Sequence, residues 1–286
     1  MPMPLIDATA LAQRLADGSP TVLLDCSFEL TDPTAGEQQY AGQGHLPGAR
    51  YAHVDRDLAG PRTDATGRFR GRHPLPSPEA WAATLGRLGI VPGSTVVAYD
   101  RHGSMYAARA WWLLRWVGHA EVAVLDGGLQ AWAAADGALE MSTPDWQAAA
   151  PYPLAAEPAM GTVEADAVAA GIGRLCLIDA RAGERFRGET EPLDAVAGHI
   201  PGALSQPFKD NLDAEGRFLP AMALRQAWAP LLAGAGGPVV HHCGSGVTAC
   251  HNLLAVAAAG LGEGLLYPGS WSEWCADPAR PVATGG

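Results

Sequence analysis

Short apolar runs alternate along the chain with longer, helix-like stretches. The runs are rich in Val, Ile and Leu, which is typical of strands buried on both faces of a parallel sheet. They are TVLLD (21–25), TVVAYD (95–100), VAVLD (122–126), LCLID (175–179), PVVHH (238–242) and GLLY (264–267). Between them, PEAWAATLGRLG (78–89) and YAARAWWLLRWVG (106–118) have the length and composition of helices. The alternation predicts an α/β fold with a mostly parallel sheet flanked by helices.

Several of these runs occur twice, in the same order. TVLLD and LCLID start 154 positions apart (21 to 175), and so do GHLPGA (44–49) and GHIPGA (198–203) (44 to 198). Three further pairs follow: GRHPLP (71–76) with GRFLP (216–220), VVAYDRHG (96–103) with VVHHCGSG (239–246), and VLDGGLQAW (124–132) with LYPGSWSEW (266–274). Co-linear matches of this kind predict a tandem duplication. The pair VVAYDRHG and VVHHCGSG places Asp100 opposite Cys243.

The duplication divides the chain into two similar domains. We expect a first domain over residues 1–139 and a second over 161–286, each with its own mostly parallel sheet. Residues 140–160, EMSTPDWQAAAPYPLAAEPAM, are rich in Pro and Ala and lack clear apolar periodicity. This composition predicts an extended linker.

Charge and composition narrow the classes of function. The 286 residues are 48% hydrophobic and 17% charged with a net charge of −11, and Lys209 is the one lysine. Nucleic-acid binding is therefore not expected, because it needs clustered basic residues. The sequence shows no apolar run of 18 residues and no signal-peptide pattern at its start, which predicts a cytoplasmic protein with no membrane partner. Five scattered cysteines argue against a disulfide framework.

The stretch VVHHCGSGVTACHN (239–252) carries the candidate chemistry. Cys243 follows an apolar strand and precedes a helix-like segment, so it lies where parallel sheets bind ligands. A helix N-terminus with converging backbone N–H groups stabilises a thiolate and binds anions. Gly244 and Gly246 allow the backbone to curl around the sulfur, while Ser245 and Thr248 add hydroxyl donors. The alternative is a structural turn with an inert buried cysteine.

These features together resemble the two-domain rhodanese-type sulfurtransferases. The resemblance rests on the tandem duplication, the two H-[LI]-P-G-A elements, CGSGVTA after a strand, and GSWSEW (269–274) near the end. CGSGVT is most similar to the 3-mercaptopyruvate branch. The family has tandem rhodanese-like domains, and its first domain lacks a catalytic cysteine. Asp100 opposite Cys243 agrees with an inactive first domain.

The resemblance implies a mechanism without a metal or an organic cofactor. Cys243 would take a sulfur from a small anionic donor and hold it as a persulfide. A thiol, cyanide or a thioredoxin-like protein would then accept the outer sulfur. The backbone N–H groups of residues 244–248, including Val247 and Thr248, would hold the persulfide anion.

Further site residues follow from the resemblance alone. Arg185 matches the arginine that binds the donor's anionic end, with Arg187 as a second candidate. Ser245 and His45 resemble the proton-relay groups of the mercaptopyruvate branch. His45 has a structural alternative, because His199 occupies the same motif in the second copy.

The donor is left open by one departure from the pattern. The mercaptopyruvate branch carries a second substrate arginine shortly before GHIPGA, where this chain has Leu193 and Asp194. The segment with Leu193 and Asp194 is more similar to the thiosulfate branch. That branch usually carries basic residues in its cysteine loop, however, where this chain has the neutral Gly244 and Ser245. We therefore expect 3-mercaptopyruvate as donor, with thiosulfate as the alternative.

Three other classes of function are weighed against this interpretation. A cysteine phosphatase needs C-x5-R, and position 249 is Ala. A zinc site from His241, His242, Cys243, Cys250 and His251 is disfavoured, because neighbouring strand residues point to opposite faces. A non-catalytic binding module is a third alternative. It applies to the first copy more than to the second, because the second copy has an intact cysteine loop.

Overall fold

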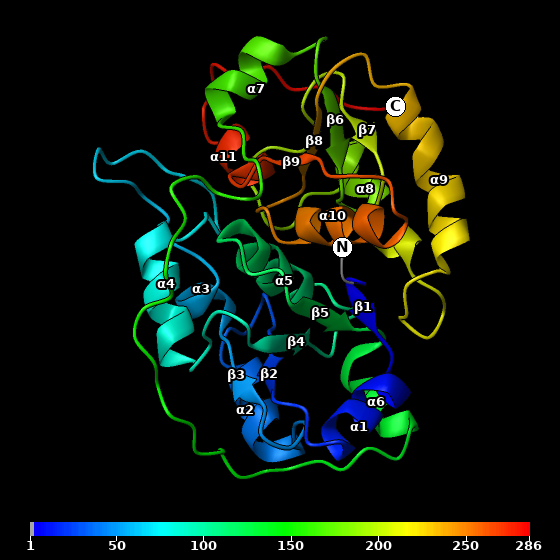
Figure 1. Ribbon diagram of the computed structural model, residues 1–286. Helices are drawn as coiled ribbons and strands as arrows, with labels where there is room; N and C mark the ends of the chain where they lie inside the picture. Colours follow the sequence, from blue (N-terminus) through cyan, green and yellow to red (C-terminus); the bar gives the residue numbers. More distant parts are fainter. Residues whose placement is uncertain (1–2) are drawn as a thin grey trace. The chain divides into compact units, whose positions relative to one another are not determined.

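The computed structural model describes residues 3–286, which form two compact units (Figure 1). Unit 1 comprises the described residues up to Gly60, together with Pro76–Met160 and Ala214–Phe218. Unit 2 comprises Pro61–Leu75, Gly161–Asp213 and Leu219–Gly286. Each unit contains one sheet and its own hydrophobic core.

The sheet of unit 1 is parallel throughout. Its strands are β1 (Leu5–Ile6), β2 (Thr21–Asp25), β3 (Arg50–Tyr51), β4 (Thr95–Tyr99) and β5 (Val122–Leu125), in the order β1-β5-β4-β2-β3. Its helices are α1 (Ala8–Ala16), α2 (Ala35–Gln43), α3 (Val54–Asp57), α4 (Pro78–Arg87), α5 (Ala107–Trp116) and α6 (Gly128–Ala134). The central strands β4 and β2 are paired along their whole length, with Asp25 opposite Tyr99.

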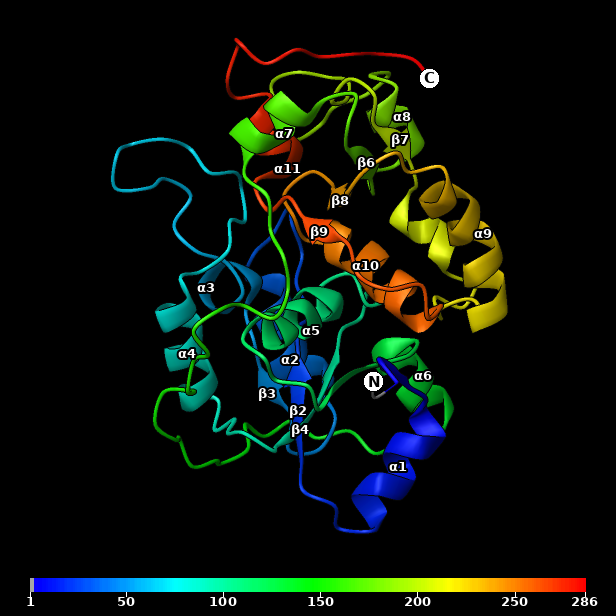
Figure 2. The ribbon, with the colours of Figure 1, turned by 45° about the horizontal axis from the view of Figure 1, so that its top comes forward.

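Unit 2 repeats this plan with fewer strands. Its sheet contains β6 (Cys176–Asp179), β7 (Leu204–Ser205), β8 (Val239–His242) and β9 (Leu265–Leu266), in the parallel order β7-β6-β8-β9. Its helices are α7 (Ala165–Gly171), α8 (Gly183–Phe186), the short 3-10 helix η1 (Phe208–Asn211), α9 (Ala221–Ala233), α10 (Thr248–Ala258) and α11 (Ser270–Trp274). Helix α10 packs against β8 and α9, as Figure 2 shows.

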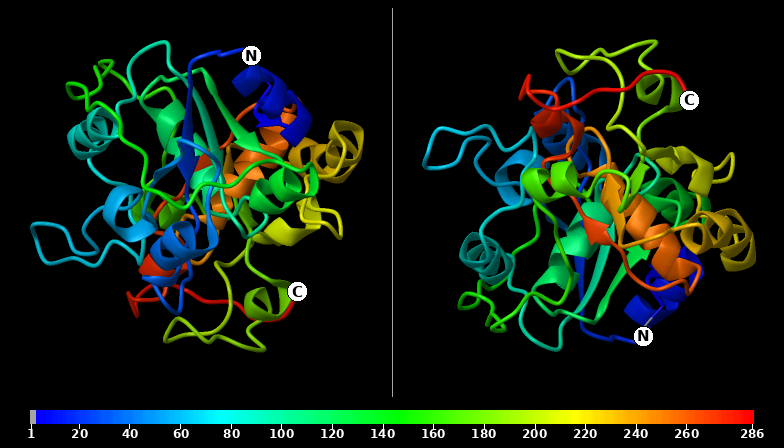
Figure 3. Two further views of the ribbon diagram at one scale, coloured as in Figure 1. Left: turned by 90° about the horizontal axis from the view of Figure 1, so that it is seen from below. Right: turned by 90° about the horizontal axis from the view of Figure 1, so that it is seen from above.

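The sequence pattern predicts these elements well. All six apolar runs contain a strand, both expected helices are present as α4 and α5, and the α/β fold with parallel sheets is confirmed (Figure 3). Helix α4 begins where local chemistry favours a start, since Ser77 Oγ accepts a hydrogen bond from the backbone N–H of Ala80 and Pro78 occupies the first turn. The two-residue strands β1, β3 and β7 lie outside the six apolar runs and are not predicted by the sequence pattern.

Four tryptophans, two in each unit, are among the buried residues of the structure. Trp111 and Trp112 of α5 are buried in unit 1, and Trp271 and Trp274 of α11 are buried in unit 2. In unit 2, both α11 residues pack with Leu177, Val240 and the other apolar side chains of the sheet. Burial of a large apolar side chain stabilises a fold by about 1.5–3 kcal/mol. The motif GSWSEW therefore anchors α11 in the core of unit 2.

Two short segments pack in the unit that is formed mainly by the other half of the chain. Pro61–Leu75, from the first half, packs in unit 2, and Ala214–Phe218, from the second half, packs in unit 1. The first segment contains residues 71–75 of the repeated element GRHPLP, and the second contains residues 216–218 of GRFLP. The predicted linker is 140–160. Apart from an isolated bridge between Glu140 and His45, its residues form no helix or strand, and they pack with unit 1, where Tyr152 donates its backbone N–H to the carbonyl of Ala82.

None of the helices among residues 3–286 has both the length and the apolar character needed to cross a bilayer.

Candidate active site

The loop that carries Cys243 joins β8 to α10 at the carboxyl end of the sheet in unit 2. Cys243 is buried, with 1% of its surface exposed. Its backbone N–H donates to Ser270 Oγ at 3.1 Å, and its carbonyl accepts from the backbone N–H of Trp271 at 2.9 Å. The start of α11 therefore holds the cysteine loop in place.

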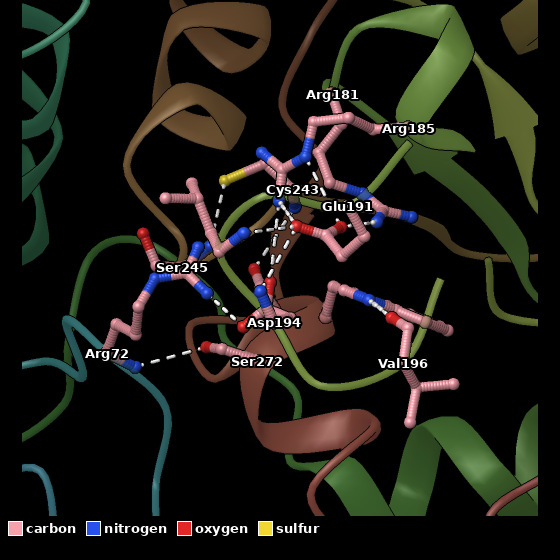
Figure 4. A network of polar contacts seen from close by, with 12 residues as sticks. Arg72, Arg181, Arg185, Glu191, Asp194, Val196, Cys243, Ser245 and Ser272 are labelled. Atoms are coloured by element: carbon pink, nitrogen blue, oxygen red, sulfur yellow. Dashed lines mark hydrogen bonds and ion pairs between the residues drawn. The ribbon is translucent and has the colours of Figure 1, made fainter. Parts of the chain in front are cut away.

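Backbone N–H groups of the loop point at the cysteine sulfur (Figure 4). Sγ of Cys243 accepts from the N–H of Gly246 at 3.1 Å and from that of Ser245 at 3.5 Å. Gly246 has φ +80°, and a Cβ at this position would overlap the carbonyl oxygen of Pro268. Only glycine fits there, because the conformation is left-handed and the neighbouring backbone is close. The loop thus directs fixed dipoles at the sulfur, and these favour a negatively charged sulfur.

The equivalent loop of unit 1 holds an anion of its own. The carboxylate of Asp100 accepts four backbone hydrogen bonds from the loop that follows it and is fully buried. The donors are the N–H groups of His102 at 2.7 Å, Ser104 at 2.9 Å, Tyr106 at 2.7 Å and Ala107 at 2.9 Å. This type of loop therefore binds a negative charge at the position that Cys243 occupies in unit 2.

A histidine contacts the serine of the cysteine loop. Nδ1 of His73 lies 2.7 Å from Oγ of Ser245, and both side chains are buried. His73 comes from the Pro61–Leu75 segment, which packs in unit 2. Sequence reasoning missed His73, although one signal was present: in the repeated element GR[H/F], the second copy has Phe218 at this position. A difference in chemistry at an otherwise repeated position marks a residue with a separate task.

Two arginines lie beside the loop, as Figure 4 shows. A Cβ added at Gly244 would lie 2.8 Å from Nη2 of Arg72 and 3.6 Å from Nη1 and Nη2 of Arg185. Arg185 pairs with Glu191 at 2.6 Å and with Asp194 at 3.4 Å, and Arg72 pairs with the other oxygen of Asp194. The predicted Arg185 therefore lies beside Gly244 of the cysteine loop, and so does Arg72.

The ion pairs continue from these arginines into the core. Arg181 pairs with Glu191 at 3.4 Å and with Asp179 at 2.7 Å, and Asp179 lies 3.8 Å from Nδ1 of His242. Burial by itself raises the pKa of Asp179, but His242 and Arg181 outweigh burial and hold this pKa below its ordinary value. Asp179 is therefore a buried carboxylate that fixes Arg181. Arg181 in turn stacks over the ring of Trp271, at 4.7 Å.

The structure gives His45 the contacts of a structural residue. His45 lies in unit 1, fully buried, with its ring stacked on Tyr40 at 3.8 Å and Nδ1 3.0 Å from the carbonyl oxygen of Leu46. His199 repeats this arrangement in unit 2, where it stacks on Phe186 at 3.8 Å and Nδ1 lies 2.8 Å from the carbonyl oxygen of the same Phe186. The shared geometry supports the structural alternative for the H-[LI]-P-G-A motif.

The remaining predicted residues are also placed. Val247 is the N-cap of α10 and Thr248 is its first residue, so both lie at the start of the helix that follows the cysteine loop. Arg187 is exposed and pairs with Glu189 at 2.7 Å. In residues 3–286 the five cysteines are free, and no cluster of His, Cys, Asp or Glu has the arrangement of a metal site.

Comparison with known proteins agrees with this geometry. Residues 7–135 and 164–277 match the family of the rhodanese-like domain. A relative from Pseudomonas aeruginosa named "Probable 3-mercaptopyruvate sulfurtransferase" is 48% identical over 98% of both chains. Thiosulfate sulfurtransferase from Gallus gallus is 32% identical over 88% of this chain and 85% of its own. The solved structure of 3-mercaptopyruvate sulfurtransferase from Leishmania major superposes with a TM-score of 0.82, at 30% identity over 96% of this chain and 75% of its own.

The fold and the cysteine loop define a tandem rhodanese-type protein. The chain belongs to the rhodanese-like domain family, with one family domain in each half.

Proposed function

We propose that the chain is a sulfurtransferase that carries a sulfane sulfur on Cys243. The observation that carries this proposal is the convergence of backbone N–H groups on Sγ of Cys243, with Asp100 in the same place in unit 1. Such a loop stabilises the thiolate before the transfer and the persulfide anion after it. The names of the relatives support the same reaction class.

The donor that we favour is 3-mercaptopyruvate. The Cys243 thiolate attacks the donor sulfur, and the electrons of the broken C–S bond form the enolate of pyruvate. The enolate takes a proton and leaves as pyruvate, while Cys243 retains the sulfur as a persulfide. An acceptor thiolate or cyanide then attacks the outer sulfur, becomes the persulfide or thiocyanate, and releases the Cys243 thiolate.

Ser245 and His73 are suited to the proton transfer in this scheme. Their 2.7 Å contact joins a hydroxyl in the cysteine loop to an imidazole, which can hold and pass a proton near pH 7. His73 takes the role that the sequence resemblance gave to His45. Arg185 binds the anionic end of the donor, because its guanidinium lies beside Gly244 and suits a carboxylate.

Thiosulfate is the second candidate donor. It is favoured by Leu193 and Asp194, which replace the expected arginine, and by the name of the Gallus gallus relative. Against it, residues 244 and 245 are neutral, whereas a thiosulfate site benefits mainly from positive charge at the leaving sulfite. The acceptor and the predicted cytoplasmic location stay predictions.

The test is an intact-mass measurement after incubation with each donor. We expect a cyanide-labile addition of one sulfur in the unaltered protein, lost in Cys243→Ser. Cys250→Ser and Cys275→Ser serve as matched controls and should keep the addition. A sulfur that persists in Cys243→Ser, or no sulfur with either donor, contradicts the proposed function.

A further inference from the structure

The Pro61–Leu75 segment contains a short hairpin that precedes His73. Thr63 and Phe69 pair in an antiparallel bridge, and Asp64 Oδ1 accepts two backbone N–H groups of the turn between them, at 2.9 and 3.1 Å. These contacts lie within the segment, so they shape the hairpin without attaching it to the rest of unit 2. The position of His73 therefore depends on contacts between the segment and other elements.

Arg70 attaches the segment to α11. Its Nη1 lies 3.4 Å from Oε1 of Glu273, and its Nη2 donates to Glu164, the N-cap of α7. The two carboxylates differ in burial, because the side chain of Glu273 is 2% exposed and that of Glu164 is 57% exposed. An exposed ion pair contributes little, whereas a buried carboxylate that loses its partner is costly. The pair with Glu273 is therefore the one that holds the segment.

Glu273 lies beside the turn that precedes α11, and the segment contacts the same turn. A Cβ added at Gly269 would overlap Oε2 of Glu273. Gly71 has φ +101°, and a Cβ there would lie 2.7 Å from the carbonyl oxygen of Gly269. Arg72 then donates its backbone N–H to Ser272 Oγ at 3.1 Å. Together with the preceding ion pair, these contacts fix three consecutive residues of the segment to α11 and the turn before it.

Helix α11 also holds the cysteine loop. The backbone N–H of Ser272 donates to the carbonyl of Gly244 at 3.0 Å. Ser245 is the next residue of the loop, and its Oγ lies 2.7 Å from Nδ1 of His73. The helix is therefore a common support for the hydroxyl and the imidazole, and Glu273 is the buried charge of the helix that meets the segment.

We infer that Arg70 and Glu273 are positioning residues, whose buried ion pair fixes His73 against Ser245 for the proton transfer. This inference rests on the proposed function, in which that contact serves protonation of the enolate. Both side chains act through the backbone that leads to His73 and have no contact with the donor in this scheme. A displacement of about 1 Å at a reacting group lowers a rate by up to about 100-fold, so an ion pair outside the reaction can control the step.

The first experiment follows the two half-reactions separately, in single turnovers. Arg70→Ala should slow pyruvate release from 3-mercaptopyruvate by roughly ten-fold, because His73 loses its fixed distance from Ser245. Discharge of the Cys243 persulfide by cyanide should stay within about two-fold, since the leaving group is a thiolate that needs no proton. Equal slowing of both half-reactions would overturn the inference, because it indicates a general loss of structure.

Two further variants provide the controls. Arg68 lies in the same hairpin and carries the same charge, but it pairs at 2.9 Å with Asp166, whose side chain is 75% exposed. Arg68→Ala should leave both half-reactions within about two-fold, because exposed ion pairs contribute little. Arg70→Lys keeps the charge and should recover much of the rate of pyruvate release. A rate as low as that of Arg70→Ala would contradict an ionic role for Arg70.

A double variant tests the pair itself. If Arg70 and Glu273 act as one unit, Arg70→Ala/Glu273→Gln should release pyruvate little more slowly than either single variant. Losses that multiply would contradict a single positioning pair. Should Arg70→Ala fail to fold, Glu273→Gln replaces it, since glutamine has nearly the shape of glutamate and leaves no charge buried.

A third measurement does not depend on sulfur transfer. Diethyl pyrocarbonate modifies imidazoles that solvent can reach, and the rate at His73 is followed by peptide mass. His73 is buried against Ser245 and should react slowly in the unaltered protein. Arg70→Ala should raise this rate several-fold, and Arg68→Ala should not. An unchanged rate contradicts the positioning role even if the proposed function holds. Conversely, a raised rate in Arg70→Ala, when the unaltered protein takes up no sulfur from either donor, contradicts the proposed function and leaves the positioning of His73 intact.

Discussion

Asp100 and Cys243 occupy equivalent positions in two copies of one loop, and each accepts hydrogen bonds from the backbone N–H groups that follow it. In unit 1 a carboxylate fills the position, and in unit 2 a sulfur does. Both halves thus have a loop whose backbone N–H groups converge on the side chain before it, a carboxylate in unit 1 and a cysteine in unit 2. The buried carboxylate of Asp100 in unit 1 indicates that this loop accommodates a negative charge.

This relationship predicts a stability cost for Asp100→Asn. An amide can accept at its oxygen, but its NH₂ group would face backbone donors in a fully buried site. We expect the free energy of unfolding to fall by about 1–3 kcal/mol, as for buried groups that lose their partners. Urea unfolding measures this, with Asp145→Asn as the exposed control. Equal unfolding curves for the two variants would mean that the four hydrogen bonds to Asp100 contribute nothing.

The contact between Ser245 and His73 predicts a donor-dependent loss of activity. Ser245→Ala and His73→Gln should each lower kcat with 3-mercaptopyruvate by roughly 100-fold, which is typical of a lost general acid. With thiosulfate the loss should be much smaller, because sulfite leaves without needing a proton. The double variant should be little worse than either single variant, because the two side chains act as one relay. Additive losses would indicate separate tasks.

The position of Arg185 predicts an effect on donor binding. Arg185→Ala removes a charge-assisted contact and should raise the donor KM by about ten-fold. Arg187→Ala provides the control, because this nearby arginine is exposed and pairs with Glu189. Steady-state kinetics with both donors measure the effect. If both variants bind the donor as the unaltered protein does, Arg185 has no part in donor binding.

The neutral cysteine loop predicts the order of the donors. We expect kcat/KM for 3-mercaptopyruvate to exceed that for thiosulfate in the unaltered protein. Ser245→Lys should shift the ratio toward thiosulfate, since it adds a positive charge beside the leaving sulfite and removes the hydroxyl that contacts His73. A side-by-side assay of both donors measures the ratio. A preference for thiosulfate in the unaltered protein would show that Leu193 and Asp194 were the better guide.

The burial of His241 predicts that the free energy of unfolding depends on pH. Burial, with a smaller contribution from His242, lowers the pKa of His241 to about 3 in the folded protein. The unfolded chain takes up this proton near pH 6.5 and the folded protein does not, so folding stability falls as pH drops below about 6.5. His241→Asn should flatten the decline by up to about 1.4 kcal/mol per pH unit. Urea unfolding at pH 7.5 and 5.5 tests this, with the partly exposed His102→Asn as control. Parallel declines in the unaltered protein and His241→Asn would contradict it.

The sequence by itself determined the duplicated α/β fold and the place of Cys243 in the loop between β8 and α10. Both depend on local patterns. Apolar runs form the strands, and the glycines after Cys243 allow the turn that directs N–H groups at its sulfur. The tertiary structure alone decided which side chains from the first half of the chain lie beside the cysteine loop. Arg72 and His73 lie some 170 positions before Cys243, and their place beside it follows from packing of the Pro61–Leu75 segment in unit 2. Contacts between such distant parts of a chain leave no periodicity in the sequence, because they depend on which surfaces pack together.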